Sequence, residues 1–305
     1  MRFGIYMPIT KKKISFIFNL FGGCLAILSV YFVIRKLSEY SNEDVRFFLN
    51  HTNVFTIVLI SVCYGCFSLL LGCVWKNILG YVGEFRTFGW AITINGITQL
   101  AKYVPGNIMH LASRQAISVA AGANGNKIAK SIFIELVILL FVGGTIGVMV
   151  LPSYLNINYE WVSWCVYLCV LVSMVFVLSK FLSIHLAKAF VLQTIFTLLT
   201  GVAFLITLRI VDPKADLSIE QSVFIIACYV SAWLIGLVTP GAPAGLGIRE
   251  YIIVYLLSGL ASESNLLLAV IISRGITVLG DFFYFIIALI LKACRGSDVE
   301  NQHGY

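Results

Sequence analysis

The chain has 305 residues, of which 60% are hydrophobic and 11% charged, and its formal net charge is +7. Water-soluble domains carry about 25% charged residues, so this chain has too little polar surface to cover a soluble globule. The composition excludes a disordered chain. It also argues against a nucleic-acid partner, because the lysines and arginines lie between long apolar stretches. We therefore expect an all-α polytopic membrane protein.

A helix needs about 20 mostly apolar residues to cross a bilayer. Residues 14–34, after a basic start, are too long for a signal peptide and have no cleavage site, so they predict the first span. Together with 14–34, the stretches long enough to cross are 54–74, 131–151, 161–179, 187–208, 221–239 and 265–291. Two further apolar regions, 88–121 and 240–260, are interrupted by polar residues, Gly and Pro. We expect about eight to ten transmembrane or re-entrant helical segments in one membrane domain over 1–305.

Basic residues mark alternate connections between these stretches. Cytoplasmic loops of membrane proteins are enriched in Lys and Arg, which predicts the cytoplasmic side for both termini. The connection 152–160 has no Lys or Arg and is expected outside. The residues that carry this prediction are Lys11–Lys13, Lys76, Arg86, Lys127, Lys130, Lys180, Lys188, Lys292 and Arg295.

The two interrupted regions resemble each other. Residues 102–106 read Lys-Tyr-Val-Pro-Gly, residues 238–241 read Val-Thr-Pro-Gly, and in both regions an arginine follows the proline by nine residues. Combined with the loop charges, this pattern predicts an inverted repeat with halves 14–151 and 161–295, which bind substrate at their interface. The segments 107–121 and 245–260 are short for full spans, and the sequence leaves open whether they cross the bilayer or are re-entrant.

Ionisable residues within the apolar regions predict the substrate site, because each costs about 2.5–3.5 kcal/mol to insert. Arg114 and Arg249 follow the Pro-Gly pairs, where helix N-termini and guanidinium groups both favour phosphate. Small residues in 240–247 allow close backbone approach to a ligand. The predicted substrate-binding residues are Lys102, Pro105, Gly106, Asn107, Arg114, Pro240, Gly241, Gly245, Gly247, Arg249 and Glu250. Two alternatives remain. Arg249 could pair with Glu250 or a neighbour, and Lys102 could extend to the membrane–water interface without binding a ligand.

Glu135 and Arg274 occupy related places in the two halves and carry opposite charge, which predicts an ion pair between them. Arg274 and Asp281 are seven residues apart and should share a helix face. Glu135 and Asp281 are each candidate proton carriers for transport. The histidines have no metal-ligand spacing, and the chain has no phosphate-binding or catalytic motif, so we expect no metal, no cofactor and no enzyme activity.

Residues 102–107 (Lys-Tyr-Val-Pro-Gly-Asn) and 239–250 (Thr-Pro-Gly-Ala-Pro-Ala-Gly-Leu-Gly-Ile-Arg-Glu) carry a family resemblance. The chain resembles the membrane domain of the lysylphosphatidylglycerol synthetase/flippase family, in the stand-alone form without the synthetase domain. The resemblance implies lipid translocation. It also implies partners among enzymes of envelope-glycan or lipid biosynthesis.

These observations favour a flippase-like protein of the bacterial inner membrane. Its expected substrate is a phospholipid or a polyprenyl-phosphate-linked sugar, moved by alternating access between the repeat halves. One alternative is an integral-membrane glycosyltransferase with a polyprenyl-phosphate donor, for which residues 42–44 (Asn-Glu-Asp) supply the only candidate acids. A second alternative is a non-transporting partner of a glycan or lipid biosynthesis enzyme.

Overall fold

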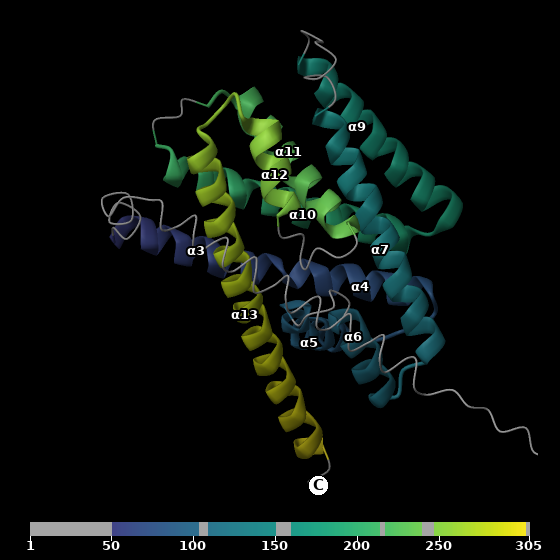
Figure 1. Cartoon of the computed structure of the whole chain (residues 1–305). Helices are drawn as coiled ribbons and strands as arrows, with labels where there is room; N and C mark the ends of the chain where they lie inside the picture. Colours follow the sequence, from purple (N-terminus) through teal and green to yellow (C-terminus); the bar gives the residue numbers. More distant parts are fainter. Residues whose placement is uncertain (1–50, 104–108, 151–159, 214–216, 240–246, 303–305) are drawn as a thin grey trace, which may run out of the picture.

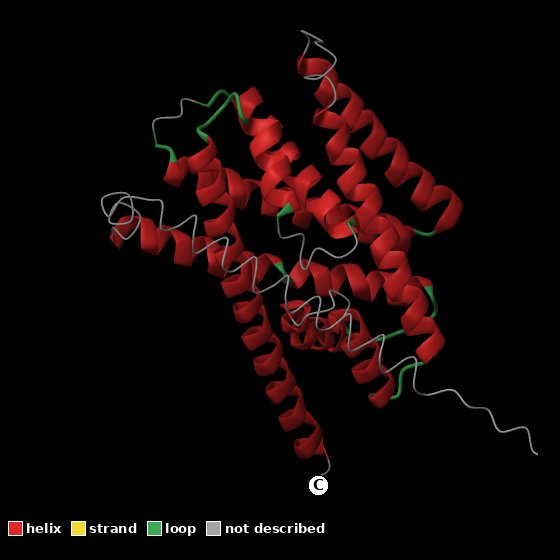
Figure 2. Ribbon diagram, viewed as in Figure 1, coloured by secondary structure: helices red, strands yellow, loops and turns green. Residues whose placement is uncertain are grey.

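The computed structural model describes residues 51–103, 109–150, 160–213, 217–239 and 247–302. All regular structure in these ranges is helical (Figure 2), which confirms the predicted all-α class. The predicted span 14–34 and the acidic loop 42–44 lie outside the described residues. The α-helices are α3 (His51–Phe67), α4 (Leu69–Tyr81), α5 (Phe88–Gln99), α6 (Met109–Ala120), α7 (Gly125–Gly147), α9 (Glu160–Val177), α10 (Ile184–Val211), α11 (Ile219–Val238), α12 (Ile248–Leu257) and α13 (Glu263–Gln302).

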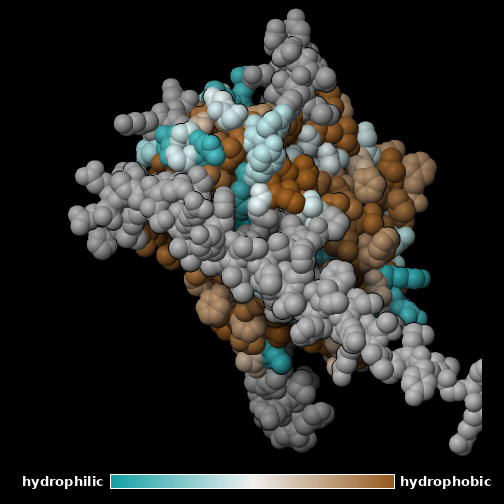
Figure 3. All heavy atoms as spheres, viewed as in Figure 1, coloured by the Kyte–Doolittle hydropathy of each residue, from teal (hydrophilic) through white to brown (hydrophobic). Residues whose placement is uncertain are grey.

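Six helical stretches are long and apolar enough to cross a membrane. They are Thr52–Tyr81, Gly125–Val150, Trp164–Leu182, Ile184–Val211, Ile219–Val238 and Glu263–Cys294. Each matches a stretch predicted from the sequence, so a multi-pass membrane protein is confirmed to that extent. Large apolar side chains such as Phe55, Phe133 and Phe176 are exposed, and apolar residues cover much of the described surface in Figure 3. A surface of this kind suits lipid rather than water.

Glycines allow the helices to approach closely. The helix α13 crosses α3 (Figure 1), with Gly280 and Gly65 at the crossing. A Cβ added at Gly65 would lie 2.8 Å from Phe283 Cβ and 2.9 Å from the Gly280 carbonyl oxygen. Small residues at helix crossings are typical of membrane proteins, because van der Waals contact replaces the hydrophobic driving force there. Gly143 has the same geometry, because an added Cβ there would lie 2.9 Å from Leu234 Cδ1.

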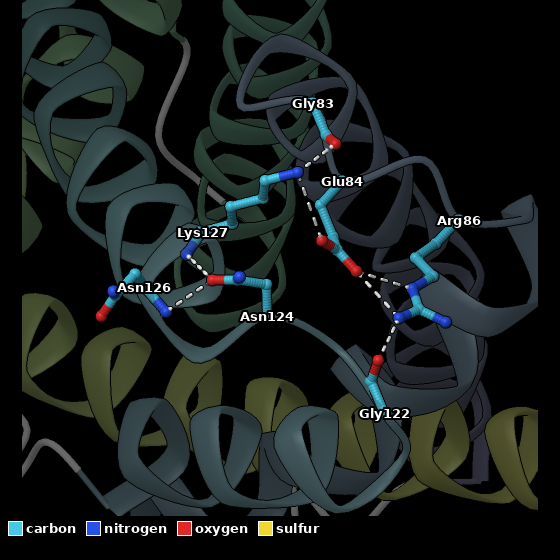
Figure 4. A network of polar contacts seen from close by, with 7 residues as sticks. All are labelled: Gly83, Glu84, Arg86, Gly122, Asn124, Asn126 and Lys127. Atoms are coloured by element: carbon cyan, nitrogen blue, oxygen red, sulfur yellow. Dashed lines mark hydrogen bonds and ion pairs between the residues drawn. The ribbon is translucent and has the colours of Figure 1, made fainter.

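The basic end of the helix bundle is the end where α4 joins α5 and α6 joins α7. Figure 4 shows Lys127 donating to the Gly83 carbonyl at 2.7 Å and Arg86 donating to the Gly122 carbonyl at 2.8 Å. Between these two residues, Glu84 forms an ion pair with Arg86 at 2.8 Å. These contacts hold the two connections side by side. Arg86 and Lys127 are the basic residues that these contacts place at this end.

The acidic end lies at the other end of α10. That helix begins beside Gly80, where a Cβ would lie 3.3 Å from His185 Nδ1, and it ends at Val211. Asp212 then accepts a hydrogen bond from the Asn265 amide at 3.0 Å, which places the start of α13 at the same end. Glu220 and Glu263 open the helices that begin there. Acidic side chains therefore gather at this end, together with Arg209 in the last turn of α10.

Two helical hairpins enter the bundle from these opposite ends. The first hairpin runs from Phe88 through α5 and the 3₁₀ helix η1 (Leu100–Tyr103), and α6 brings it back to the basic end at Gly122. The second hairpin runs inward along α11, and α12 returns toward the acidic end. This arrangement is the one an inverted repeat requires, and the repeat itself stays a prediction.

The returning arms are too short to cross a membrane alone. Helix α6 has 12 residues and α12 has 10, which correspond to about 18 Å and about 15 Å. The hydrocarbon core is about 30 Å thick. For the described parts of 107–121 and 245–260, these helix lengths favour re-entrant segments over full membrane crossings.

Candidate functional site

Arg114, on the first hairpin, is a buried and neutralised cation. Its guanidinium donates to a Glu135 carboxylate oxygen at 2.6 Å, and the side chain is 4% exposed. The guanidinium carbon lies 5.1 Å from the centre of the Trp75 ring, a cation–π geometry. Glu135 comes from α7, which packs against α6. The pair leaves no net charge at this position.

Arg274 and Glu250 form the corresponding pair on the second hairpin, at 2.8 Å. The other Glu250 oxygen accepts from the Gly247 backbone N–H at 2.7 Å and caps the start of α12. The predicted Glu135–Arg274 ion pair is therefore wrong. Each acid instead pairs with the arginine on the helix that packs beside it in its own half of the chain.

Arg249 has a different environment. Its side chain is buried, with 8% of the residue exposed, and lies over the Tyr229 ring at 5.7 Å. Within the described residues no hydrogen bond or ion pair reaches its guanidinium, and its Nε is buried without a partner. Glu250 does not neutralise it, because successive residues of a helix point to different faces. The alternative of an Arg249–Glu250 pair is thus wrong.

Among the described residues, two positive charges and one negative charge lie at the second hairpin. Arg249 and Arg274 interact electrostatically and share only the Glu250 carboxylate among these three residues. Burying an unpaired charge is costly and usually marks a functional group in a membrane protein. An anion placed beside Arg249 would balance it.

Asp281 anchors the first hairpin from α13. It is fully buried and accepts from Lys102 and from the Tyr103 hydroxyl, while its Oδ1 has no partner within the described residues. Lys102 is therefore paired with Asp281 rather than free for a ligand. Arg274 and Asp281, predicted to share a face of α13, contact the second and the first hairpin respectively. The helix α13 thus ties both hairpins together.

Several predicted binding residues cannot be placed. Pro105, Gly106, Asn107, Pro240, Gly241 and Gly245 lie outside the described residues. Gly247 is described, at the N-cap of α12 with φ +86°, a conformation that favours glycine. Among the residues described, no group of three His, Cys, Asp or Glu side chains is arranged to hold a metal ion.

The sequence did not single out the aromatic residues under the arginines. Trp75 and Tyr229 lie within apolar stretches and look like ordinary packing residues in the sequence. The only available signal is that a tyrosine or tryptophan in a span carries a polar group that needs a partner. That signal does not identify the arginine above the ring.

Neither a protein-family model nor a curated protein matches this chain. The resemblance to the flippase family therefore stays an expectation, carried by the two quoted segments alone.

Proposed function

We propose that the chain is a membrane lipid translocator whose substrate has a phosphate in its head group. A phospholipid and a polyprenyl-phosphate-linked sugar both fit this description. The observation that supports the proposal is the charge of Arg249, which is buried at the first turn of α12 and has no ion pair within the part of the chain that the structure describes. A phosphate beside it would gain a charge-assisted hydrogen bond and the favourable field of a helix N-terminus.

Arg249 is a better ligand for the head group than Arg114. Arg114 has the Glu135 carboxylate at 2.6 Å, which an incoming phosphate would have to displace. Arg249 has no such competitor among the described residues. We therefore assign phosphate binding to Arg249 and a structural role to the Arg114–Glu135 pair.

Transport requires that the site face each side in turn, and α13 is suited to couple the hairpins. It holds the second hairpin through Arg274 and the first through Asp281, seven residues further along. A shift of α13 would move both hairpins together. We propose that this shared helix links opening at the acidic end to closing at the basic end.

The charge distribution supports an orientation. By the positive-inside rule, the basic end faces the cytoplasm and the acidic end faces outward. We accordingly place the chain in a bacterial inner membrane, with its C-terminal helix ending on the cytoplasmic side. The candidate acids of a glycosyltransferase, residues 42–44, lie outside the described residues, and no described contact favours that activity or a purely structural partner role.

The proposal is tested by reconstituting the chain in vesicles with a fluorescent phosphatidylglycerol and following its exposure to a membrane-impermeant quencher. Arg249→Gln should slow lipid movement at least about tenfold, because a charge-assisted hydrogen bond contributes about 1.5–3 kcal/mol. Arg249→Lys should retain part of the rate. Arg209→Gln is the matched control, since Arg209 lies near the acidic end, where it donates to the Ser222 hydroxyl at 3.2 Å and has no other bond among the described residues. Unchanged movement by Arg249→Gln would refute the assignment.

A further inference from the structure

The Asp281 carboxylate is a buried acid that takes no part in the proposed phosphate site. It is fully buried on α13, and its Oδ2 accepts from the Lys102 ammonium and from the Tyr103 hydroxyl, both on η1. Its Oδ1 is buried and has no hydrogen-bond partner within the described residues. A buried carboxylate oxygen without a donor is costly as an anion, and a bound proton removes that cost.

Few charged or titratable groups surround this carboxylate. The elements packed against α13 include η1, α3, α5, α10 and α12. Lys102 and Tyr103 face Asp281 from η1, and Tyr64 lies in its field from α3. Helix α5 has no charged residue, those of α10 lie near its two ends, and those of α12 lie around Arg274. Within the described part of the chain, Lys102 is thus the cation that keeps Asp281 ionised.

Glu135, the other candidate proton carrier, has a less suitable partner. Its partner Arg114 is a guanidinium with a side chain 4% exposed, so protonation of Glu135 would strand a permanent charge in the bundle. The Lys102 side chain is 25% exposed, and its flexible stem lets the ammonium turn outward when Asp281 is neutral. The Lys102–Asp281 pair can therefore open without leaving a buried charge.

A line of polar side chains on α13 leads from the acidic end to Asp281. Ser273 and Thr277 precede Asp281 by eight and four residues, so the three share one face of the helix. The Ser273 hydroxyl is buried without a partner among the described residues. The Thr277 hydroxyl donates within its own helix at 2.9 Å and interacts with the Tyr103 hydroxyl that reaches Asp281. Hydroxyl groups can both accept and donate a proton, as a relay requires.

A second line, on α6, leads from the basic end. His110, Arg114 and Ser118 are spaced by four residues and share a face of the helix, which ends near Gly122. The His110 Nδ1 and the Ser118 hydroxyl are buried without partners in the described ranges. The charge of Lys102 acts on His110, which places this end of the line beside the Lys102–Asp281 pair. The two lines therefore approach one carboxylate from opposite ends of the bundle.

We propose that Asp281 is a proton-binding site and that a proton crossing from the acidic to the basic end drives lipid movement. The proton, taken from water, binds Oδ1, and the ion pair with Lys102 opens. This frees η1 and the first hairpin from α13. The proton returns to water on the other side when Lys102 pairs with Asp281 again. A metal cation would fit poorly, because it would lie beside the Lys102 ammonium with a single carboxylate. The proton site stands by itself, whereas its coupling to lipid rests on the proposed function.

Difference infrared spectroscopy of the purified full chain, between neutral and acidic pH, tests the proton site without lipid movement. Wild type should show the carbonyl band of a buried carboxylic acid at acidic pH, and Asp281→Asn should lack it. Asp212→Asn is the matched control and should keep the band, because Asp212 lies at the acidic end beside Asn265. A wild-type chain without the band, or an unchanged band in Asp281→Asn, would overturn the site.

A second variant guards against misfolding of the first. Lys102→Gln leaves Asp281 with its acid but without its cation, so the band should already be present at a neutral pH where wild type lacks it. Detergent size-exclusion profiles check that both variants fold. A Lys102→Gln band that appears only at the pH of the wild-type band would contradict the ion pair as the control of this proton.

Coupling is measured in vesicles that contain the full chain, fluorescent phosphatidylglycerol and a trapped pH dye. An imposed pH gradient should accelerate lipid movement by wild type and by Asp212→Asn about fivefold or more, and a protonophore should abolish the acceleration. Asp281→Asn should lose the response to the gradient, and Asp281→Glu should recover part of it. Lipid movement by wild type that ignores the gradient would overturn the coupling, as would a wild-type response in Asp281→Asn.

Failure of the proposed function gives a different result. A chain that moves no phosphatidylglycerol, while its infrared band still depends on Asp281, would refute lipid translocation and support the proton site. Lipid movement that depends on Arg249, in a chain without the Asp281 band, would overturn the proton site and support the proposed function.

Discussion

At the scale of single residues, three buried arginines with similar sequence settings have different partners. Arg114 is paired with Glu135 and Arg274 with Glu250, whereas Arg249 lies over the Tyr229 ring and has no ion pair among the described residues. Breaking a buried ion pair leaves an uncompensated charge, but removing a charge that was never paired relieves one. Replacing Arg114 or Arg274 should therefore destabilise the protein, whereas the same replacement of Arg249 should not.

Glu135→Gln should lower the free energy of unfolding by about 3 kcal/mol, because it strands the Arg114 charge in the bundle. The double variant Glu135→Gln, Arg114→Gln should recover much of this loss. Thermal unfolding in detergent measures both. A double variant as unstable as the single variants added together would contradict the pairing.

Arg249→Gln should unfold at the same temperature as wild type or higher, since it removes a charge that repels Arg274 and has no ion pair within the described ranges. Arg274→Gln, the comparison, should unfold at a lower temperature because it leaves the Glu250 carboxylate without the arginine that neutralises it. The same detergent melts report both. A marked fall in the melting temperature of Arg249→Gln would show that Arg249 has a structural partner.

At the scale of elements, α13 organises the bundle through one close crossing and two charged contacts. Gly280 meets α3 at the crossing, Arg274 reaches α12, and Asp281 reaches η1. The crossing depends on the absence of a side chain, since a Cβ at Gly280 would overlap the Tyr64 ring.

Gly280→Ala should therefore destabilise the protein by about 1–3 kcal/mol through overpacking. Gly275→Ala lies on the same helix with nothing within 4 Å of the added Cβ, and it should stabilise by up to about 1 kcal/mol through helix propensity. Unfolding of the two variants under the same conditions compares them. Equal effects would argue against a tight crossing.

The sequence predicted the elements better than their contacts. The lengths of the apolar stretches located the six long helices. Helix α7 begins at Gly125, earlier than the predicted 131, because Lys127 and Lys130 lie at the helix end, where charge is tolerated. Capping by Asn124, which accepts from the Asn126 and Lys127 N–H groups, explains that start. The partners of Glu135 and Arg274 were mispredicted, because apolar pattern gives no information on which helices lie side by side.

At the scale of the whole molecule, two hairpins open toward opposite ends of unlike charge. The first returns to the turn near Gly122 and the second to the region of Asp212 and Asn265. Alternating access, as proposed above, would require such opposed hairpins.

Single cysteines introduced at Asn126 and at Glu263, in a chain without its native cysteines, should react with a membrane-impermeant maleimide from opposite sides. By the positive-inside rule, Glu263→Cys should react in intact cells and Asn126→Cys only after the membrane is permeabilised. Reaction of both from the same side would contradict the opposed hairpins.

The most direct measurement is the thermal stabilisation that phosphatidylglycerol confers on the purified chain. A ligand that binds only the folded state, at about 100 times its Kd, adds about 2.7 kcal/mol, which corresponds to a rise of several degrees in Tm. We expect that rise for wild type and for Arg209→Gln, and its loss in Arg249→Gln. An equal rise in Arg249→Gln would contradict anion binding by the unpaired arginine.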